Sequence, residues 1–355
     1  MDVQVKRSAL TVLGPVLAIF HTGTFIAFFL VVLLRFSRKI AMKLLKTLSL
    51  CALMAATITS QAEFNPDPAS RYNDNIVLAY PYVDEQPKPE RGAVTVGEAM
   101  SDPLLMASSV LVMDQKSGEV LFDKNADYQQ PIASITKLMT AIIVLNAEQP
   151  LYQMLSVTAA DAAVARPTHS RLKVGARLSR GELLHLMLMA SENRAAAALA
   201  RSYPGGLPRF IKQMNETAQA LGLLSTNFAD PTGLHTANMS TARDLAKLVK
   251  HAYGFDVIRE YSTSPEYAVS LRRARTTRFQ NTNRLTRSSD WEIGLSKTGY
   301  ISASGQCLVL QAAVAGRPLV MVILDSSGKG GRIDDAVRLR SWLEQHNDRW
   351  VVAHM

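Results

Sequence analysis

The sequence has 355 residues, 48% of them hydrophobic and 19% charged, a composition that excludes a disordered or fibrous protein. Apolar runs long enough to cross a bilayer occur only within the first sixty or so positions, which excludes a polytopic membrane protein. The net charge of +9 is concentrated at the N-terminus, because residues 1–62 carry +6 of it. The remaining +3 gives no reason to expect a nucleic-acid partner.

Two hydrophobic segments lie near the N-terminus. Ala9 to Leu34 is largely apolar and long enough to span a bilayer, so residues 1–41 are either an anchor helix or upstream read-through. Residues 42–62 have the pattern of a secretory signal peptide, with a basic start, an apolar centre and the cleavage site Ser60-Gln61-Ala62. We therefore expect export to the periplasm by a signal peptide that starts at Met42. A loose association with the membrane requires that the first segment be retained.

A linker separates these segments from the folded part of the chain. Residues 63–104 contain six of the 15 prolines and show no sustained hydrophobic periodicity. We assign residues 105–350 to one folded domain, which the motifs below indicate to be catalytic. It opens with two β-rich runs, Ser109–Asp114 and Glu119–Phe122, around a turn that contains glycine, and this pattern predicts a hairpin.

The middle of the domain is predicted to be mostly helical. The run from Ile135 to Leu145 is apolar nearly all round, which indicates a buried helix. Ser179-Arg-Gly-Glu182 has the pattern of a capping box and begins a second helix. Thr241-Ala-Arg-Asp244 begins another helix in a similar way.

Strand character returns near the C-terminus. Gln306–Val314 and Pro318–Asp325 read as two strands joined by a turn, and a helix is predicted from about Ile333 to Gln345. Strands at both ends around a helical centre predict an α/β (α+β) fold: an antiparallel sheet built from both chain ends, flanked by helices, with an all-helical insertion. A functional site is expected between the sheet and the insertion.

The cysteines and histidines indicate neither a disulfide nor a metal site. Cys51 lies in the predicted signal peptide, so Cys307 has no partner, and we interpret it as a core residue of a strand. The seven histidines are scattered and include no His-x-x-x-His pair. We expect no metal and no cofactor.

A serine and a lysine three positions apart at a helix start can act together in catalysis. One helical turn brings them into contact, a neutral amine can accept the hydroxyl proton, and the serine amide can stabilise an oxyanion. Ser134 and Lys137 stand at the head of the apolar run, whose burial lowers a lysine pKa. For the other two matches, Ser170/Lys173 and Ser326/Lys329, we interpret the lysines as solvated surface residues.

Two further short motifs occur where the predicted elements favour a site. Ser191-Glu192-Asn193 lies between two helical runs of the insertion, and Lys297-Thr298-Gly299 ends a run that predicts an edge strand. A second copy of each motif, at 225–227 and 116–118, falls in a predicted loop or turn and is explained by turn chemistry.

In this order and at this wide spacing, the three motifs resemble the signatures of penicillin-recognising serine acyltransferases. The longer stretches at 131–140, 230–235 (Asp-Pro-Thr-Gly-Leu-His) and 297–308 extend the resemblance to the low-molecular-mass D,D-peptidases. Over roughly residues 105–346 the sequence is most similar to the D-alanyl-D-alanine endopeptidases of the penicillin-binding protein 7 type. The resemblance implies a β-lactamase/transpeptidase-like fold.

The resemblance also implies catalytic roles for three residues. Ser134 corresponds to the nucleophile that forms an acyl-enzyme, and Lys137 to its general base. Ser191 corresponds to the residue that relays a proton towards the leaving amine. Glu192 departs from the aspartate that commonly stands in the middle of this motif, and we interpret the change as minor.

Five residues are implied to bind the substrate. Asn193 would hydrogen-bond the substrate backbone, while Lys297 and Thr298 would hold its negatively charged end. The amides of Ser134 and Tyr300 would form the oxyanion hole. The full set of implied substrate-binding residues is Asn193, Lys297, Thr298, Gly299 and Tyr300.

We therefore expect a periplasmic serine D,D-endopeptidase that hydrolyses D-alanyl cross-links in peptidoglycan and is covalently inhibited by β-lactam antibiotics. A D-alanyl-D-alanine carboxypeptidase using the same residues is the nearest alternative. The sequence ends soon after its last predicted helix, without the C-terminal domain of many such carboxypeptidases, which favours the endopeptidase. A β-lactamase is disfavoured, because no glutamate is placed to activate a deacylating water. A non-catalytic wall-binding module or a membrane-anchored scaffold is the alternative from another class.

Two other features have simpler interpretations. His235 is interpreted as a packing residue rather than a catalyst. An arginine-rich stretch without acids lies between Tyr267 and Ser289, and we expect it to form a solvated hairpin, with attraction to acidic groups of a cell-wall polymer as the alternative. Its arginines are Arg272, Arg273, Arg275, Arg278, Arg284 and Arg287.

Overall fold

The computed structural model describes residues 102–164, 170–272, 275–328 and 330–346. The predicted anchor or read-through segment, the signal peptide and nearly all of the linker lie outside these residues, so those assignments stay predictions. Arg273 and Lys329 also lie outside them. Within the described part of the chain, no helix combines the length and the apolarity that a membrane span needs.

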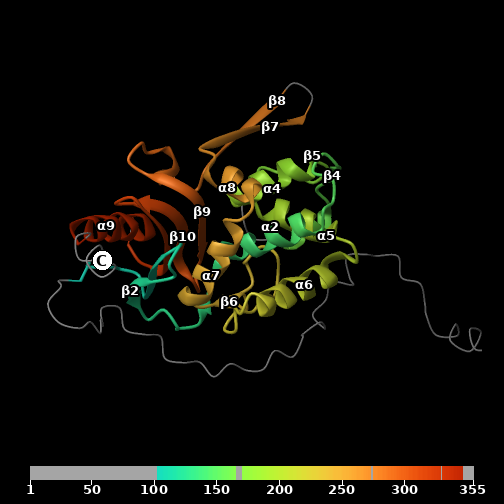
Figure 1. The fold of residues 1–355 in the computed structure, drawn as a ribbon. Coiled ribbons are helices and arrows are strands. Elements are labelled where there is room, and N and C mark those ends of the chain that lie inside the picture. Colours follow the sequence, from blue (N-terminus) through green and yellow to red (C-terminus); the bar gives the residue numbers. More distant parts are fainter. Residues whose placement is uncertain (1–101, 165–169, 273–274, 329, 347–355) are drawn as a thin grey trace, which may run out of the picture. The chain divides into compact units, whose positions relative to one another are not determined.

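A five-stranded antiparallel sheet is built from both ends of the described chain, as predicted (Figure 1). Two strands come from the N-terminal side, where they form the predicted hairpin, and three come from the C-terminal side. In spatial order the strands are β2 (Val120–Lys124), β1 (Ser109–Asp114), β11 (Arg317–Ser326), β10 (Gly305–Val314) and β9 (Glu292–Ile301). Strand β9 is an edge strand of this sheet, as predicted for the segment that carries Lys297-Thr-Gly.

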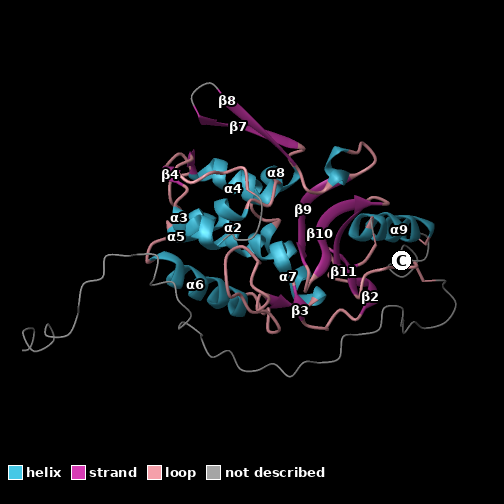
Figure 2. Cartoon of the chain, turned by 180° about the vertical axis from the view of Figure 1, so that it is seen from behind, coloured by secondary structure: helices cyan, strands magenta, loops and turns pink. Residues whose placement is uncertain are grey.

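The central strands are apolar on both faces because both faces are covered. On β10, Cys307 and Val309 belong to a core shared with the helical region, whereas Leu308 and Leu310 belong to a second core shared with α9 (Gly331–Gln345). This division follows from the alternation of side chains along a strand. Figure 2 shows α9 on one side of the sheet and the helical region on the other.

The chain between the first hairpin and β9 is mostly helical, as predicted. The expectation of an all-helical insertion is wrong, because this region also contains short antiparallel strand pairs, several of them too short to show a strand pattern in the sequence. Its helical elements are a 3-10 turn at Ala133–Thr136, α2 (Lys137–Asn146), α3 (Ala159–Val164), α4 (Arg180–Met189), α5 (Asn193–Arg201), α6 (Gly206–Ala220), α7 (Ala242–Ala252), α8 (Asp256–Thr263) and a 3-10 turn at Arg284–Arg287. Short antiparallel pairs join β3 (Gln130–Pro131) to β6 (Met239–Ser240), β4 (Met154–Ser156) to β5 (Arg177–Ser179), and β7 (Glu266–Arg272) to β8 (Arg275–Gln280).

Two of these helices begin as their sequences predict. The Ser179 side chain accepts a hydrogen bond from the Glu182 amide, and the Glu182 carboxylate accepts one from the Ser179 amide, so the capping box is complete. The Thr241 side chain caps α7 by accepting a hydrogen bond from the Asp244 amide. These caps fix where the polypeptide enters α4 and α7.

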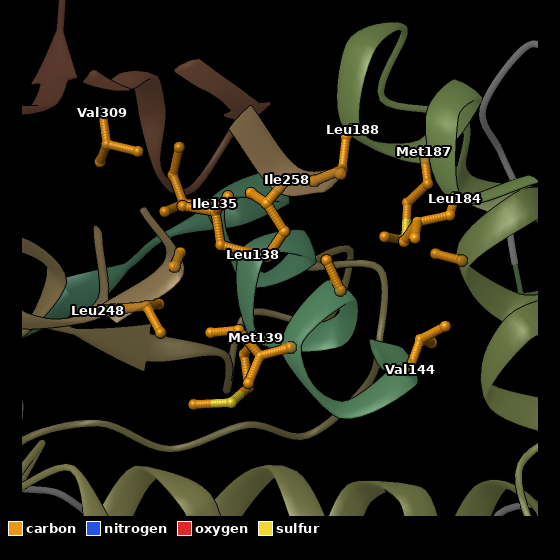
Figure 3. Close-up of a cluster of buried hydrophobic side chains, with 14 of the residues drawn as sticks. Ile135, Leu138, Met139, Val144, Leu184, Met187, Leu188, Leu248, Ile258 and Val309 are labelled. Carbon is orange, nitrogen blue, oxygen red and sulfur yellow. The ribbon is translucent and has the colours of Figure 1, made fainter. Parts of the chain in front are cut away.

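Helix α2 lies at the centre of the helical region. Figure 3 shows Ile135, Leu138 and Met139 packed among apolar side chains that include Leu184 of α4 and Leu248 of α7. The helix is buried because its sequence is apolar nearly all round, as predicted. The α-helix itself starts at residue 137 rather than at 135, because the preceding four residues form the 3-10 turn. This start places a lysine, the charged residue of α2, at the edge of an apolar core.

Candidate active site

The predicted nucleophile and base lie side by side. Ser134 is in the 3-10 turn before α2, and Lys137 is the first residue of that helix. Lys137 Nζ lies 2.7 Å from Ser134 Oγ. The same amine donates to the Thr232 carbonyl oxygen at 2.5 Å and to Asn193 Oδ1 at 2.7 Å. Ser134 Oγ also donates to the Thr232 carbonyl oxygen, at 3.4 Å. The Ser134 hydroxyl and the Lys137 amine therefore share this one acceptor.

Burial changes the chemistry of the Lys137 amine. The side chain is fully buried, and desolvation lowers its pKa from 10.5 to about 7. The carboxylates of Asp230 and Glu192 oppose this effect, since negative charge favours the ammonium form. At pH 7 about half of the amines are therefore neutral, against about one in three thousand for an unperturbed lysine. A neutral amine at this distance can accept the proton of a hydroxyl.

The second motif occupies the turn between α4 and α5. Asn193 is the first residue of α5, and its side chain accepts the hydrogen bond from Lys137. Ser191 has a backbone φ of +58°, in the left-handed region that residues other than glycine rarely adopt. This conformation lets Ser191 Oγ accept a hydrogen bond of 2.9 Å from Lys297 Nζ. The turn thus joins the two lysines of the site through neighbouring polar side chains.

The third motif lies on edge strand β9. Lys297 is buried, and its amine donates to Ser191 Oγ and to the Thr298 carbonyl oxygen, each at 2.9 Å. Its pKa is well below 10.5, chiefly because it is desolvated and also because Lys137 and Arg332 carry positive charge nearby. The hydroxyl of Thr298 is within 2.6 Å of the Thr282 hydroxyl. The motif therefore presents a desolvated amine and a hydroxyl at neighbouring positions.

Two glycines let the backbone around the nucleophile pack tightly. A Cβ at Gly233 would lie 1.9 Å from the Ala133 carbonyl oxygen, and a Cβ at Gly299 would lie 3.2 Å from the Ser134 amide nitrogen. Ala133 itself has a φ of +48°. The backbone of residues 132–134 therefore lies between the turn at 230–235 and strand β9. This contact brings β9 alongside the Ser134 amide, as the predicted oxyanion hole with the Tyr300 amide requires. The Tyr300 side chain is 63% exposed.

The turn at 230–235 contributes a group that the sequence did not single out, the carbonyl of Thr232. The Asp230 carboxylate fixes this turn by accepting hydrogen bonds from the amides of Thr232, Gly233 and His235. The Asp-Pro-Thr-Gly pattern was the available signal, because an aspartate often accepts from amides shortly after it. His235 is exposed, so its interpretation as a packing residue is wrong. Its ring Nδ1 accepts from the Ala237 amide.

Arg332, on the first turn of α9, is a second residue that sequence analysis missed. Its Nη1 donates to the Gly299 carbonyl oxygen at 2.7 Å, on the strand that carries Lys297. Its guanidinium also contributes to the low pKa of Lys297. No local pattern pointed to Arg332, because only the folded arrangement brings α9 next to β9.

The alternative Ser-x-x-Lys pairs do not form comparable sites. Ser170 Oγ donates to Glu192 Oε2 at 2.6 Å, and Lys173 is exposed, as predicted. Ser326 is buried and donates to Asp335 Oδ2 at 2.6 Å, while its companion lysine is outside the described residues. Ser134 therefore differs from the other two serines, because it contacts a buried lysine amine whereas they donate to carboxylates.

The remaining predictions about single residues concern Cys307 and the arginine-rich stretch. Cys307 is buried on β10, as predicted, and desolvation raises the pKa of its thiol to about 11. The predicted hairpin is formed by β7 and β8, where Arg278 is exposed and pairs with Glu266. Arg284 and Arg287 lie outside it, in the 3-10 turn that follows β8, so the hairpin holds only part of the arginine-rich stretch. In the described ranges, His, Cys, Asp and Glu side chains form no group of three or more that could hold a metal ion.

Comparisons with known proteins agree with this geometry. The family described as D-alanyl-D-alanine carboxypeptidase matches residues 96–328. The chain belongs to this family. A D-alanyl-D-alanine endopeptidase of Pseudomonas aeruginosa is 45% identical over 68% of this chain and 78% of its own length. A D-alanyl-D-alanine endopeptidase of Escherichia coli is 39% identical over 76% of this chain and 86% of its own length.

The fold has relatives of known structure. The crystal structure of the Streptomyces K15 DD-transpeptidase superposes with a TM-score of 0.64 at 28% identity, over 68% of this chain and 98% of that one. The predicted family, the β-lactamase/transpeptidase-like fold and the assignment as a serine D,D-peptidase are therefore confirmed.

Proposed function

We propose that this protein is a serine D,D-endopeptidase that hydrolyses D-alanyl cross-links in peptidoglycan through an acyl-enzyme on Ser134. The observation that carries the proposal is the 2.7 Å contact between Ser134 Oγ and the amine of the fully buried Lys137. With a pKa of about 7, this amine is neutral often enough to act as a base near neutral pH.

The reaction begins with proton transfer. The neutral Lys137 amine takes the Ser134 hydroxyl proton while Oγ attacks the carbonyl carbon of the D-alanyl peptide bond, and the carbonyl oxygen becomes an oxyanion at the Ser134 amide. The intermediate collapses by breaking the C–N bond, and the Lys137 ammonium gives up its proton, which reaches the leaving amine through the Ser191 hydroxyl and leaves Lys137 neutral again. Water then attacks the ester and transfers a proton to the base, which regenerates the Ser134 hydroxyl and releases the acid. Atoms and protons balance over the two half-reactions.

The two lysines of the site have different neighbours and therefore different proposed roles. Lys137 Nζ lies 2.7 Å from the Oγ of the nucleophile Ser134, whereas Lys297 Nζ lies 2.9 Å from Ser191 Oγ. The Lys297 amine and the guanidinium of Arg332, which contacts the same strand, suit the negatively charged end of the substrate, with Thr298 supplying a hydroxyl donor. Asn193 accepts a hydrogen bond from Lys137 through Oδ1, and the donor it would use towards a substrate carbonyl is its amide NH₂.

The choice of leaving amine rests on the relatives. The same residues serve endopeptidase and carboxypeptidase reactions, because both pass through the same acyl-enzyme. The relatives named endopeptidases are 45% and 39% identical to this chain, whereas the E. coli D-alanyl-D-alanine carboxypeptidase DacC is 32% identical and is covered over 64% of its length. This difference favours cross-linked peptides as substrates. A periplasmic location fits both the predicted signal peptide and that substrate.

Purified muropeptides test the proposal. The wild type should convert cross-linked dimers into monomers, with little release of terminal D-alanine from monomeric pentapeptide. Ser134→Ala should leave both substrates intact while it retains the wild-type melting temperature. Release of D-alanine without loss of dimers would identify a carboxypeptidase instead, and turnover by Ser134→Ala would exclude Ser134 as the nucleophile.

A further inference from the structure

A buried carboxylate stands between Ser191 and Asn193 and takes no part in the reaction described above. Glu192 is 8% exposed, and its Oε2 accepts a 2.6 Å hydrogen bond from the Ser170 hydroxyl. Its two neighbours each contact a lysine: Ser191 Oγ accepts from Lys297, and Asn193 Oδ1 accepts from Lys137. One short turn therefore directs two side chains to the lysines and a third to Ser170.

The segment that Glu192 contacts is itself fixed to other parts of the fold. Besides the Ser170 bond, the Leu172 carbonyl accepts a hydrogen bond of 2.8 Å from Arg194 Nη1 on α5. The Arg171 guanidinium lies 3.8 Å from the ring centroid of Phe279 on β8. Residues 170–172 thus give Glu192 a supported partner, which a freely moving loop could not supply.

The Ser191–Asn193 turn needs such support because its backbone conformation is unfavourable. Ser191 has a φ of +58°, which costs energy for a residue with a side chain. No side chain caps the N-terminus of α5, where Glu192 is the N-cap residue. The Glu192 amide donates to the Leu186 carbonyl oxygen at 3.2 Å, and its carboxylate makes the contact with Ser170. Loss of that contact would free the turn to relax away from the lysines.

The charge of Glu192 also acts on the base. Its carboxylate and that of Asp230 favour the ammonium form of Lys137, against the desolvation that lowers the pKa of this lysine. Around Glu192 itself, burial raises the carboxyl pKa, while Ser170, Arg171 and Arg194 oppose the rise. Desolvation lowers the pKa of the neighbouring buried Lys297, and Lys137 and Arg332 in turn lower it further.

We propose that Glu192 is a positioning residue for the reaction: through Ser170 it holds the Ser191–Asn193 turn against the two lysines, and its carboxylate sets the electrostatic potential at the Lys137 amine. This inference rests on the proposed acyl-enzyme mechanism. It means that the glutamate in this motif is not interchangeable with an uncharged residue of the same size.

The test is the pH dependence of acylation by a fluorescent penicillin. The second-order rate constant is measured from pH 5 to pH 9 for the wild type, Glu192→Gln and a matched control, Glu216→Gln, which removes a partly exposed carboxylate on α6. The wild-type rate should rise with pH to a plateau as Lys137 loses its proton. Without the Glu192 charge the midpoint should move to lower pH. The rate at pH 6, expressed as a fraction of the plateau rate, should therefore be about two- to threefold higher for Glu192→Gln than for the wild type. The control should overlay the wild type.

Two charge-preserving variants test the positioning role. Glu192→Asp keeps the charge but shortens the side chain, and Ser170→Ala removes the hydrogen-bond donor. Both should lower the plateau rate at least threefold, with the Glu192→Asp midpoint close to that of the wild type. If Glu192→Gln proves too unstable to purify, Glu192→Asp and Ser170→Ala still decide the positioning role.

Three results have distinct meanings. A Glu192→Gln profile that overlays the wild type overturns the electrostatic role of Glu192, and wild-type plateaus in Glu192→Asp and Ser170→Ala overturn its positioning role. A wild-type protein that is never acylated refutes the proposed function itself, which is a separate failure.

Discussion

Replacing Lys137 by methionine should slow acylation at least a hundredfold and yet stabilise the protein at acid pH. Methionine has a similar length and no charge, so it fits an apolar core better than a desolvated amine does. The sign follows from the pKa values: the lysine titrates near 10.5 in the unfolded chain and at about 7 in the folded protein. Between these values the unfolded state binds more protons, so wild-type stability rises with pH across this window and falls as pH drops towards 7.

The size of this effect can be worked out from the same two values. The burial penalty of the Lys137 ammonium is about 5 kcal/mol at pH 6 and about 2 kcal/mol at pH 9, so about 2–3 kcal/mol of stability depends on pH in this interval. Against this gain, the substitution removes the hydrogen bonds that the Lys137 amine donates to the Thr232 carbonyl and to Asn193 Oδ1, at a cost of about 1–3 kcal/mol. The variant should therefore be more stable than the wild type at pH 6 and roughly equal to it at pH 9.

Differential scanning calorimetry at the two pH values measures this difference. For a domain of this size the melting-temperature gap between variant and wild type should shrink by about 5–10 °C from pH 6 to pH 9. Lys212→Met, on the exposed side of α6, is the matched control and should show no change in the gap. An identical pH dependence for wild type and Lys137→Met would refute the reasoning, because it would mean that Lys137 stays charged in the folded protein.

Three further predictions concern the framework around the site. Gly233→Ala should lower the free energy of unfolding by more than about 2 kcal/mol and slow acylation, because its Cβ would lie 1.9 Å from the Ala133 carbonyl oxygen. The control is Gly222→Ala, which has a similar φ but open space around the Cβ, and it should cost about 1 kcal/mol and leave acylation unchanged. Ser179→Ala should lower stability by about 1 kcal/mol in a denaturant titration with normal activity, since it removes only a helix cap. The Cys307 thiol, whose pKa burial raises to about 11, should resist iodoacetamide at pH 8 until the protein is unfolded; rapid labelling of native protein would contradict its burial.

Much of the fold could be predicted because hydrophobic pattern and position agree along the chain. The apolar strands 305–314 and 317–326 and the uniformly apolar helix α2 are covered on all sides, and their sequences reflect that. The capping box at Ser179 is a local feature and was predictable for the same reason. The 3-10 turn before α2 was not, because it depends on the contacts of Ala133 with Gly233 and Gly299, which come from distant segments.

The site was predictable where its chemistry is carried by side chains in short motifs. The contact between Ser134 and Lys137 follows from their spacing, and tertiary packing brings the predicted Asn193 and Lys297 into the same hydrogen-bond network. The Thr232 carbonyl was missed because every residue has a backbone carbonyl, so the residue type does not indicate which one takes part in a site. Arg332 was missed because it is brought to the site by the packing of α9 on the sheet. Glu192, first interpreted as a minor change, has a buried hydrogen bond to Ser170 that only the folded chain reveals.

Mapping the site of a β-lactam adduct tests the catalytic assignment most directly. The protein is incubated with a penicillin at neutral pH, digested, and analysed by peptide mass spectrometry. A single adduct should appear on the hydroxyl of residue 134, should be absent from Ser134→Ala, and should form at least a hundredfold more slowly in Lys137→Met. An adduct on any other side chain, or an unchanged rate without the lysine, would contradict the mechanism.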